Sequence, residues 1–347
     1  MSAPAERTTV SGCHIVYFDD GEPGITRRKT RHGAWAYHDA DGKRITDRDE
    51  IDRLNAIGLP PAYTDAWFCP DPSGHIQAVG WDEKGRKQYR YHVDYRAQQE
   101  AAKYDLCAPF GRALTKLRAR VEADLEKRTH SKERTVAAIV KLLDMAALRI
   151  GNETYAKTNK SYGLTTLRDR HAQIKGSTLS LQYKAKSGKT RKLRITDGSL
   201  ARFVKKCQDL PGQKLFQYVG DDGAPHAVTS SDVNAYLREA MGDGFTAKHF
   251  RTWGASVVAF EALVEAPAPI GLKTMLEPVV ERLGNTPAIA RKSYVHPALI
   301  ELGKDKAAQA AFRQGLRLPR ASQYLSRTER GLIAFLEQSG ACELKAA

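Results

Sequence analysis

Two arginines and one tyrosine, far apart in the chain, stand in sequence contexts suited to chemistry at a phosphate. Arg149 comes at the end of a very apolar helical pattern, Arg251 falls in the first turn of a predicted helix, and Tyr294 follows a short basic run. Guanidinium groups keep their charge and donate paired hydrogen bonds to phosphate, so they can stabilise a pentacoordinate phosphorus without a metal. A tyrosine is a suitable reversible nucleophile because its phenolate leaves readily. The combination predicts metal-free transfer of a phosphodiester.

Each of these residues has a simpler interpretation when it is taken alone. Arg149 could form a buried ion pair with Asp144 or Glu153, because a charge beside so apolar a helix needs a partner. Arg251 could lie in a solvated helical turn, although a cation there opposes the helix dipole unless an anion is present. Tyr294 is one of fourteen tyrosines, and any single tyrosine usually packs in a core. Only the combination and order of the three favour the chemical interpretation.

The net charge of the 347-residue chain is +15. Each Lys or Arg that contacts a phosphate releases condensed counterions, so this excess favours a polyanionic partner. No apolar run is long enough to cross a bilayer, and the first seven residues contain no apolar signal core, which predicts a cytosolic protein. The five cysteines are scattered and form no C-x-x-C pair, which indicates free thiols rather than a zinc cluster or a disulfide framework.

Motifs for nucleotide or metal binding are incomplete. Ser187-Gly188-Lys189-Thr190 resembles the end of a phosphate-binding P-loop, but Tyr183 stands where that motif requires glycine. Asp39-x-Asp41-Gly42 lacks the turn glycine of a calcium loop, because Arg44 occupies its position. Neither an H-E-x-x-H pair nor a G-x-S-x-G elbow occurs. We therefore expect no metal and no nucleotide cofactor.

The elements that must position these residues change in kind along the chain. Residues 1–95 are rich in strand and turn patterns, interrupted by one predicted helix near residues 47–57. Helical periodicity dominates after residue 95, with a very apolar helix centred on residues 136–150. A strand pattern returns at residues 179–195, which alternate like a hairpin around Ser187-Gly188.

The composition shift near residue 99 predicts two domains. Residues 1–99 would form a small, mainly-β domain, because strand and turn patterns dominate there. Residues 100–347 would form a larger, mainly-α domain that carries a short β-hairpin or sheet. The predicted fold class is α+β.

These segments together resemble the type IB DNA topoisomerases, specifically their poxvirus-like bacterial branch. The pattern comprises L-R-I-G-N-E at residues 148–153, K-x-F-R-T-W at 248–253 and S-Y-V-H-P at 293–297. Two N-terminal stretches, G-H-I-Q-A at 74–78 and G-R-K-Q-Y-R-Y-H at 85–92, belong to the same resemblance. Each motif is short, but their number and order from about residue 30 to residue 300 make the resemblance specific.

The resemblance implies a role for each catalytic position. Arg149 and Arg251 would bind the scissile phosphate, and Tyr294 would form a 3′-phosphotyrosyl bond. Asn285 stands where the family usually has a histidine. Its amide can donate a hydrogen bond to a phosphate oxygen but cannot carry charge.

A lysine in the hairpin is implied as the general acid that protonates the leaving 5′-oxygen. Lys186 matches this position best. Lys184 and Lys189 remain alternatives, because the register of a hairpin is not visible in its sequence.

In the N-terminal domain, four residues match family positions that contact DNA: Arg86, Gln88, Tyr89 and Tyr91. Strand alternation places Gln88 on one face and both tyrosines on the other, so a twist or a bulge is needed if all are to reach DNA. A place in the core is the alternative for Tyr91.

In the larger domain, a helix that the family places in the major groove corresponds to the segment after Arg149. The implied contacts there are Tyr155, Lys157, Asn159 and Lys160. Lys248, three residues before Arg251, is a further DNA-binding candidate.

The implied activity is relaxation of supercoiled double-stranded DNA by transient cleavage and religation of one strand. A monomer would act as a clamp, with its two domains closing around the duplex. The bond energy stays in the phosphotyrosine, so neither ATP nor a metal would be needed. Such an enzyme would be cytoplasmic and associated with the nucleoid.

A tyrosine recombinase and a non-catalytic DNA-binding protein are the alternatives. Recombinases use nearly the same catalytic set, but they favour His-x-x-Arg at the second arginine, where this chain has Lys248-x-x-Arg251. A DNA-binding protein without activity would explain the charge but not the ordered Arg, Lys, Arg and Tyr residues.

Overall fold

The computed structural model describes residues 7–10 and 13–346, and the chain divides into two compact units, 1–102 and 103–347. Helix α2 (Val93–Asp105) carries the chain from the first unit into the second. The domain boundary suggested by the sequence, at residue 99, falls inside this helix. The prediction about a signal core concerns the first residues of the chain, and residues 1–6 lie outside the described part.

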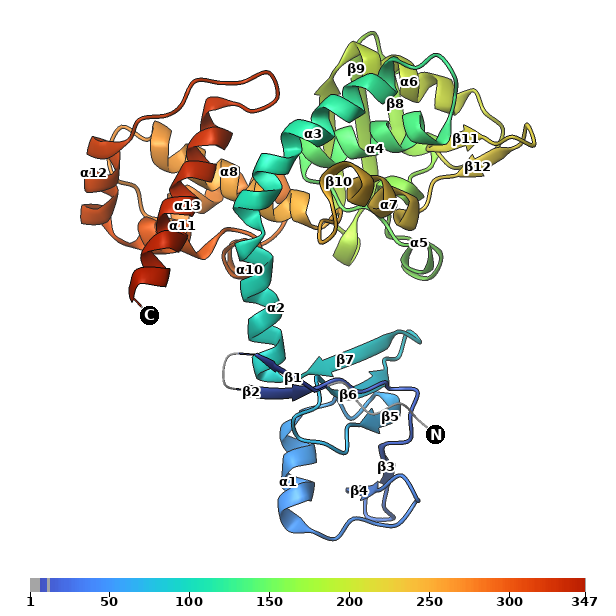
Figure 1. Ribbon diagram of the computed structural model, residues 1–347. Helices are drawn as coiled ribbons and strands as arrows, with labels where there is room; N and C mark the ends of the chain where they lie inside the picture. Colours follow the sequence, from blue (N-terminus) through green and yellow to red (C-terminus); the bar gives the residue numbers. More distant parts are fainter. Residues whose placement is uncertain (1–6, 11–12, 347) are drawn as a thin grey trace. The chain divides into compact units, whose positions relative to one another are not determined.

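The first unit is built on a five-stranded antiparallel sheet with the strand order β4-β3-β5-β6-β7 (Figure 1). Its strands are β3 (Ile25–Lys29), β4 (Trp35–His38), β5 (Thr64–Phe68), β6 (Ile76–Trp81) and β7 (Lys87–Tyr91), with a separate pair β1 (Arg7–Val10) and β2 (Cys13–Val16) and one helix, α1 (Arg48–Ala56). The helix predicted near residues 47–57 is confirmed: the Asp47 carboxylate caps it by accepting from the Asp49 N–H. Its Leu54 packs with Ile25 and Phe68 in a small core.

The second unit is mainly helical and contains a three-stranded antiparallel sheet of order β10-β9-β8. Its helices are α3 (Cys107–Glu126), α4 (Lys132–Ala146), α5 (Glu153–Asn159), α6 (Gly198–Gln208), α7 (Ser230–Met241), α8 (His249–Glu265), α9 (Leu272–Leu283), α10 (Pro287–Ser293), α11 (Pro297–Lys304), α12 (Lys306–Gly315) and α13 (Arg327–Ala346). Its strands are β8 (Ala172–Lys175), β9 (Thr178–Lys184), β10 (Thr190–Thr196), β11 (Gln217–Val219) and β12 (Pro225–Ala227). The α+β class and the hairpin predicted at 179–195 are confirmed, while the short β11–β12 pair was not predicted.

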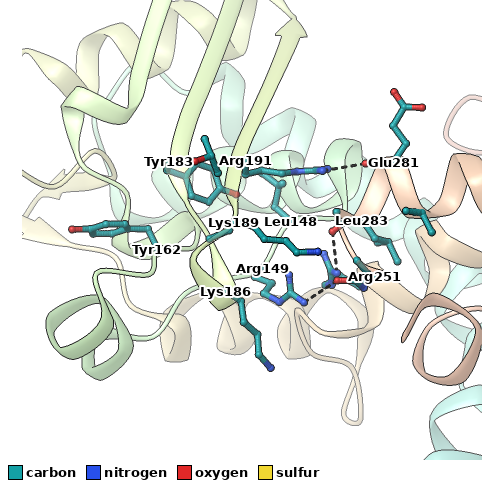
Figure 2. Close-up of a pocket in the computed structure, with 15 residues that line it drawn as sticks. Leu148, Arg149, Tyr162, Tyr183, Lys186, Lys189, Arg191, Arg251, Glu281 and Leu283 are labelled. Atoms are coloured by element: carbon teal, nitrogen blue, oxygen red, sulfur yellow. Dashed lines mark hydrogen bonds between the residues drawn. The ribbon is translucent and has the colours of Figure 1, made fainter. Parts of the chain in front are cut away.

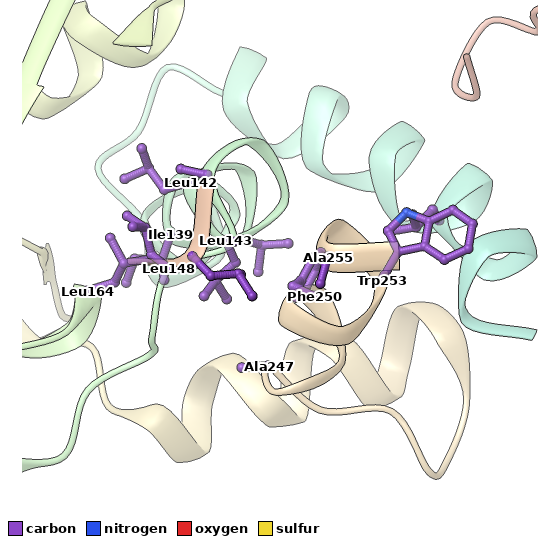
Figure 3. Packing of buried hydrophobic residues seen from close by; sticks show 14 of the residues in the cluster. Ile139, Leu142, Leu143, Leu148, Leu164, Ala247, Phe250, Trp253 and Ala255 are labelled. Atoms are coloured by element: carbon purple, nitrogen blue, oxygen red, sulfur yellow. The ribbon is translucent and has the colours of Figure 1, made fainter. Parts of the chain in front are cut away.

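The core of the second unit fixes the ends of α4 and α8 relative to each other. Figure 3 shows Leu143 of α4 on the side that faces Phe250 and Ala255 of α8, and all three are buried. Each Leu or Phe buried in such a core contributes roughly 1.5–3 kcal/mol. The two helix ends that this packing holds are those next to Arg149 and Arg251.

Helix α4 ends earlier than the apolar pattern predicted. The Ser131 side chain caps its start, and Ala147 ends it in the left-handed backbone conformation, with φ 47°. The apolar run continues to Ile150 because Leu148 is buried beyond the helix end. Periodicity alone could not separate a buried helix from the buried segment that follows it.

The described cysteine side chains are consistent with free thiols. Cys69, Cys107 and Cys207 are buried and unpaired, and burial raises the pKa of Cys69 to about 11 and those of Cys107 and Cys207 to about 12. The side chains of Cys13 and Cys342 lie outside the described part. Among the described residues, no helix combines the length and apolarity that a bilayer crossing requires.

Candidate active site

An open pocket in the second unit collects residues from four segments of the chain. The segment after α4 contributes Arg149, the β9–β10 turn contributes Lys186 and Lys189, α8 contributes Arg251, and the α9–α10 connection contributes Asn285. Figure 2 shows the Arg149 and Arg251 side chains reaching toward the same end of the pocket. The structure therefore brings together residues that are more than one hundred positions apart in the sequence.

Arg149 stands just beyond helix α4 rather than inside it. Its carbonyl accepts a hydrogen bond from the Leu164 N–H at 3.0 Å, which ties this segment to the chain that leads into the sheet. Its guanidinium donates to Asn285 Oδ1 at 3.2 Å. The two contacts hold the guanidinium at the wall of the pocket.

The ion pairs considered for Arg149 from the sequence are wrong. Asp144 binds Arg118, whose Nε lies 2.7 Å from Asp144 Oδ2. Glu153 binds Lys214. Both carboxylates are therefore occupied elsewhere, and the partner of the Arg149 guanidinium among the described residues is a neutral amide oxygen.

Arg251 is almost fully buried, with 5% of its surface exposed, so the alternative of a solvated helical turn is wrong. Helix α8 approaches Ala147 closely at Gly254, where a Cβ atom would lie 3.2 Å from the Ala147 Cβ. Arg251 Nη1 donates to the Ala147 carbonyl at 2.6 Å and Nη2 to the Leu283 carbonyl at 3.4 Å, while Nε has no hydrogen-bond partner. Burial, and then the charge of Arg149, lower the pKa of Arg251.

Asn285 comes directly after Gly284, the residue that ends α9 in left-handed conformation. Because its Oδ1 accepts from Arg149, its Nδ2 is the donor that remains, and this buried nitrogen has no partner. Asn285 Nδ2 and Arg251 Nε are thus two unused donors on residues of one pocket. A buried unsatisfied donor costs roughly 1–3 kcal/mol, which an anion bound in the pocket could recover.

Tyr294 lies at the C-terminal end of α10 and is half-buried. It does not line the pocket, but Arg251 contacts both, with its Cζ 4.7 Å from the centre of the Tyr294 ring. Burial raises the pKa of Tyr294, but the charges of Arg251, Arg149 and Lys186 outweigh it and leave that pKa below its ordinary value. Loss of the phenol proton is therefore easier here than in a free tyrosine.

The three candidate lysines differ in their relation to the pocket. Lys186 and Lys189 line it, and Lys184 does not. Lys186 lies in a tight turn, where Ser187 and Gly188 both have positive φ, and Figure 2 shows its side chain extending away from Arg149. The charge of Lys186 nevertheless contributes to the lowered pKa of Tyr294.

Arg191 is a pocket residue that the sequence reasoning missed. It donates to the carbonyls of Glu281, at 3.1 Å, and of Arg282 at the C-terminal end of α9. Cations are favoured at that end of a helix. Through these contacts Arg191 links the β-hairpin to the end of α9, next to the loop that carries Asn285. The alternation of side chains along β10 was the signal in the sequence. It places Arg191 on the face of the strand that is turned to the core, opposite the buried Tyr183.

Two of the predicted N-terminal contacts are held by one carboxylate. Asp82 Oδ2 accepts from Arg86 Nε at 2.7 Å and from Gln88 Nε2 at 3.1 Å. The hydrogen bond from Arg86 is the main cause that lowers the pKa of Asp82 to about 2. A DNA phosphate would compete with this carboxylate for Arg86.

Tyr89 and Tyr91 share an exposed face of β7. Their rings stack with centroids 5.8 Å apart, and 39% and 45% of their surfaces are exposed. The core alternative for Tyr91 is therefore wrong. The β6–β7 register shifts between Ile76 and Ala78, so a bulge does occur there, but it leaves both tyrosines on one face and Gln88 turned to Asp82.

The predicted contacts of the larger domain are exposed but lie outside the pocket. Helix α5 has no buried residue, and its Tyr155 is 44% exposed. Lys157, Lys160 and Lys248 are also exposed, and Asn159 is partly so. Apart from Ala156, which packs against the core, the side chains of this helix are left for an external partner.

Comparisons with known proteins assign the chain to a family. Residues 92–304 match the model of the catalytic core of eukaryotic DNA topoisomerase I, and residues 34–82 match the N-terminal domain of bacterial DNA topoisomerase IB. DNA topoisomerase 1B of Acanthamoeba polyphaga mimivirus is 32% identical over 293 residues, which cover 80% of this chain and 87% of the viral protein. The chain belongs to the type IB DNA topoisomerase family. This topoisomerase carries the bacterial form of the N-terminal domain.

More distant relatives span most of the topoisomerase. DNA topoisomerase 1B of vaccinia virus (strain Copenhagen) is 21% identical over 289 residues, 77% of this chain and 89% of the viral protein. Among solved structures, a XerH site-specific recombinase bound to its difH substrate is 14% identical, with a TM-score of 0.35, over 52% of this chain and 48% of the recombinase. The recombinase likeness is too weak to carry any part of the argument.

Proposed function

We propose that this topoisomerase relaxes supercoiled DNA by transient cleavage of one strand, with Tyr294 as the nucleophile. The observation that carries the proposal is Arg251, a buried cation without a carboxylate partner among the described residues, which lines the pocket and lies over the Tyr294 ring. A desolvated, unpaired guanidinium is costly to keep and is suited to an anionic ligand. That ligand would be the scissile phosphate.

Arg149, Arg251 and Asn285 would bind the non-bridging oxygens of this phosphate. The two arginines would supply charge-assisted hydrogen bonds, and the unused Asn285 Nδ2 a neutral one. As phosphorus becomes pentacoordinate, negative charge builds on these oxygens, where buried donors act more strongly than in water. The same groups would therefore bind the transition state more tightly than the intact strand.

The bond changes balance without a cofactor. The Tyr294 oxygen forms a bond to phosphorus while the bond from phosphorus to the 5′-oxygen breaks. The phenol proton of Tyr294, whose loss the lowered pKa favours, passes to solvent water, and Lys186 donates a proton to the leaving oxygen. One phosphodiester replaces another, so the 5′-hydroxyl can attack back and reseal the strand without ATP. The described residues contain no group of three or more His, Cys, Asp or Glu that could hold a metal ion.

Lys186 is proposed as the general acid because its charge acts on Tyr294. Lys189 is the alternative, since it lines the same pocket. Lys184 has neither property in its favour.

Double-stranded DNA would also contact exposed residues of both units. In the N-terminal unit these are Arg86, Gln88, Tyr89 and Tyr91, and in the larger unit Tyr155, Lys157, Asn159 and Lys248. We propose a monomer that acts on the nucleoid in the cytoplasm, since one chain holds the full catalytic set and carries a net charge of +15.

The decisive experiment maps the residue that becomes linked to DNA. The protein is mixed with supercoiled plasmid, denatured during turnover and digested, and the DNA-linked peptide is sequenced; we expect the link at Tyr294. Tyr294→Phe should bind DNA with unchanged affinity and form no adduct. An adduct on another residue, or relaxation that strictly requires ATP or a divalent cation, would overturn the mechanism.

A further inference from the structure

One face of the β8–β9–β10 sheet is open to solvent and carries only polar and basic side chains. Alternation along the strands and the pairing register place ten residues on this open face: Gln173 and Lys175 of β8; Thr178, Ser180, Gln182 and Lys184 of β9; and Thr190, Lys192, Arg194 and Thr196 of β10. All are exposed or partly exposed. The face holds four cations, no acidic residue and no apolar residue.

The opposite face of the same sheet is largely apolar and covered, so the two faces of the sheet differ in kind. Leu179 and Leu181 are buried there, and helix α6 packs against β8 and β9. A sheet with one covered face normally carries mixed polar and charged residues on the other. Here the charges have a single sign.

The four cations of the open face are not used inside the protein. Among the described residues, none of Lys175, Lys184, Lys192 and Arg194 forms an ion pair or a side-chain hydrogen bond. Cations of one sign on neighbouring strands repel one another, so the face becomes more favourable when an anion lies on it.

The open face begins next to the pocket. Lys184 and Thr190, which pair with each other, flank the turn that brings Lys186 and Lys189 to the pocket. From this pair to Thr178 and Thr196 the strands run for six residues, about 20 Å at roughly 3.3 Å per residue. That length corresponds to about six base pairs at 3.4 Å per step.

We propose that the open face binds the phosphate backbone of duplex DNA next to the segment held in the pocket. The inference rests on the proposed function, since it takes the pocket to hold DNA. The face has no aromatic residue on which an unpaired base could stack and no apolar patch for a protein partner. Its lysines, arginine and hydroxyls are the groups that contact phosphates without reading sequence.

The test removes three cations that take no part in the pocket. Lys175, Lys192 and Arg194 are replaced together by Gln, and binding to a duplex of about 30 base pairs is measured between low and moderate salt. The slope of log affinity against log salt should fall by up to about 2.7, or about 0.9 for each phosphate that the variant no longer neutralises.

The matched control removes the same charge from the far side of the sheet. Arg202, Lys205 and Lys206 are exposed on α6, whose other side packs against β8 and β9, and their replacement by Gln should leave the slope nearly unchanged. An equal decrease in both triple variants would mean a general charge effect and would overturn the proposal. An unchanged slope in the open-face variant would overturn it as well.

Covalent adduct formation separates this inference from the proposed function. At saturating DNA, the open-face variant should form the Tyr294 adduct at the wild-type rate, because its substitutions lie outside the pocket. Failure of the wild-type protein to form any adduct would reject the proposed function, whereas the salt slopes alone decide the role of the open face.

Discussion

Arg118 and Arg251 of the second unit are both withdrawn from solvent, but their hydrogen-bond partners differ in charge. Arg118 of α3 donates to Asp144 of α4 and to Glu329 of α13, each at 2.7 Å in its closest contact. Arg251 of α8 donates to two backbone carbonyls, forms no ion pair with a carboxylate among the described residues, and keeps Nε without a hydrogen-bond partner. Burial lowers the pKa of both, but the two carboxylates outweigh it at Arg118 and raise that pKa, whereas the pKa of Arg251 stays lowered.

The difference separates a structural cation from a functional one. Arg118 joins three helices and has its charge compensated within the protein, so it has little capacity left for a ligand. Arg251 is held in place by neutral carbonyls, which fix its position without neutralising it. A missing carboxylate beside a buried cation is thus a sign of an anion site, and substitutions that add or remove charge should act oppositely at the two places.

The largest effect is expected from Arg251→Gln. Removing a guanidinium that stabilises a transferring phosphoryl group should slow single-turnover DNA cleavage by about 10³- to 10⁵-fold. The free energy of unfolding should not fall, because an unpaired buried charge is removed. Cleavage kinetics and chemical denaturation measure the two effects. If the variant cleaves DNA normally but unfolds more easily, Arg251 has a structural role like that of Arg118.

The next largest effect concerns the proton donor. Lys186→Ala should slow cleavage by about 10²- to 10⁴-fold, the usual range for general acid catalysis. A DNA substrate with sulfur in place of the 5′-bridging oxygen should restore the rate, because a thiolate leaves without a proton. Lys189→Ala is the matched control. Rescue of the Lys189 variant instead would reassign the role to that lysine.

Asn285→Asp would give a pocket arginine a carboxylate partner, as Arg118 already has. The new carboxylate would face Arg149 across the present 3.2 Å contact and offset the positive charge of the pocket. Cleavage should slow by about 10²- to 10³-fold, the loss typical for one transition-state donor. The free energy of unfolding should rise by about 1 kcal/mol, as for a partly exposed charge pair. Lower stability together with lower activity would contradict the comparison.

Glu329→Gln should have the opposite effect: it should lower the stability of the protein and leave DNA cleavage nearly unchanged. It keeps the shape of the side chain but removes a charge from Arg118, and it weakens the contact with Trp253 Nε1, which lies 3.5 Å from Glu329 Oε1. The free energy of unfolding should fall by about 2–3 kcal/mol, somewhat less than for a fully buried pair. At temperatures well below unfolding, the rate of DNA cleavage should stay within about threefold of wild type, a change of less than 1 kcal/mol.

The smallest effect is the acid dependence of stability. Hydrogen bonds and charge from Arg118 outweigh burial and hold the pKa of Glu329 below its ordinary value of 4.5. A lowered carboxyl pKa contributes stability that is fully present above the unfolded-state value and is lost as pH falls through the folded-state value. Wild type should therefore lose more stability than Glu329→Gln as pH drops below about 4.5. Parallel curves would mean that Glu329 contributes no charge to the structural site.

Several features of the fold follow from local patterns, and these were predictable. Helix α1 was predicted near residues 47–57, and alternation around Ser187-Gly188 located the β9–β10 hairpin. Other features depend on long-range contacts. The end of α4 at Ala146 was missed because the buried segment beyond it is just as apolar. The exposure of Tyr91 depends on how its ring lies against Tyr89 and against Tyr95 of α2, which strand alternation does not reveal.

The sequence by itself determined which residues are available for chemistry: the order of Arg149, a hairpin lysine, Arg251 and Tyr294, within a basic chain. The tertiary structure decided their partners. In the folded chain Asp144 forms an ion pair with Arg118. Arg149 donates a hydrogen bond to Asn285, 136 positions away, and the buried Arg251 donates one to the Ala147 carbonyl, 104 positions away. The fold also brings Arg191 to the pocket. The physical reason is that periodicity records which face of an element is apolar, whereas burial and pairing of a charge depend on which other elements pack against it.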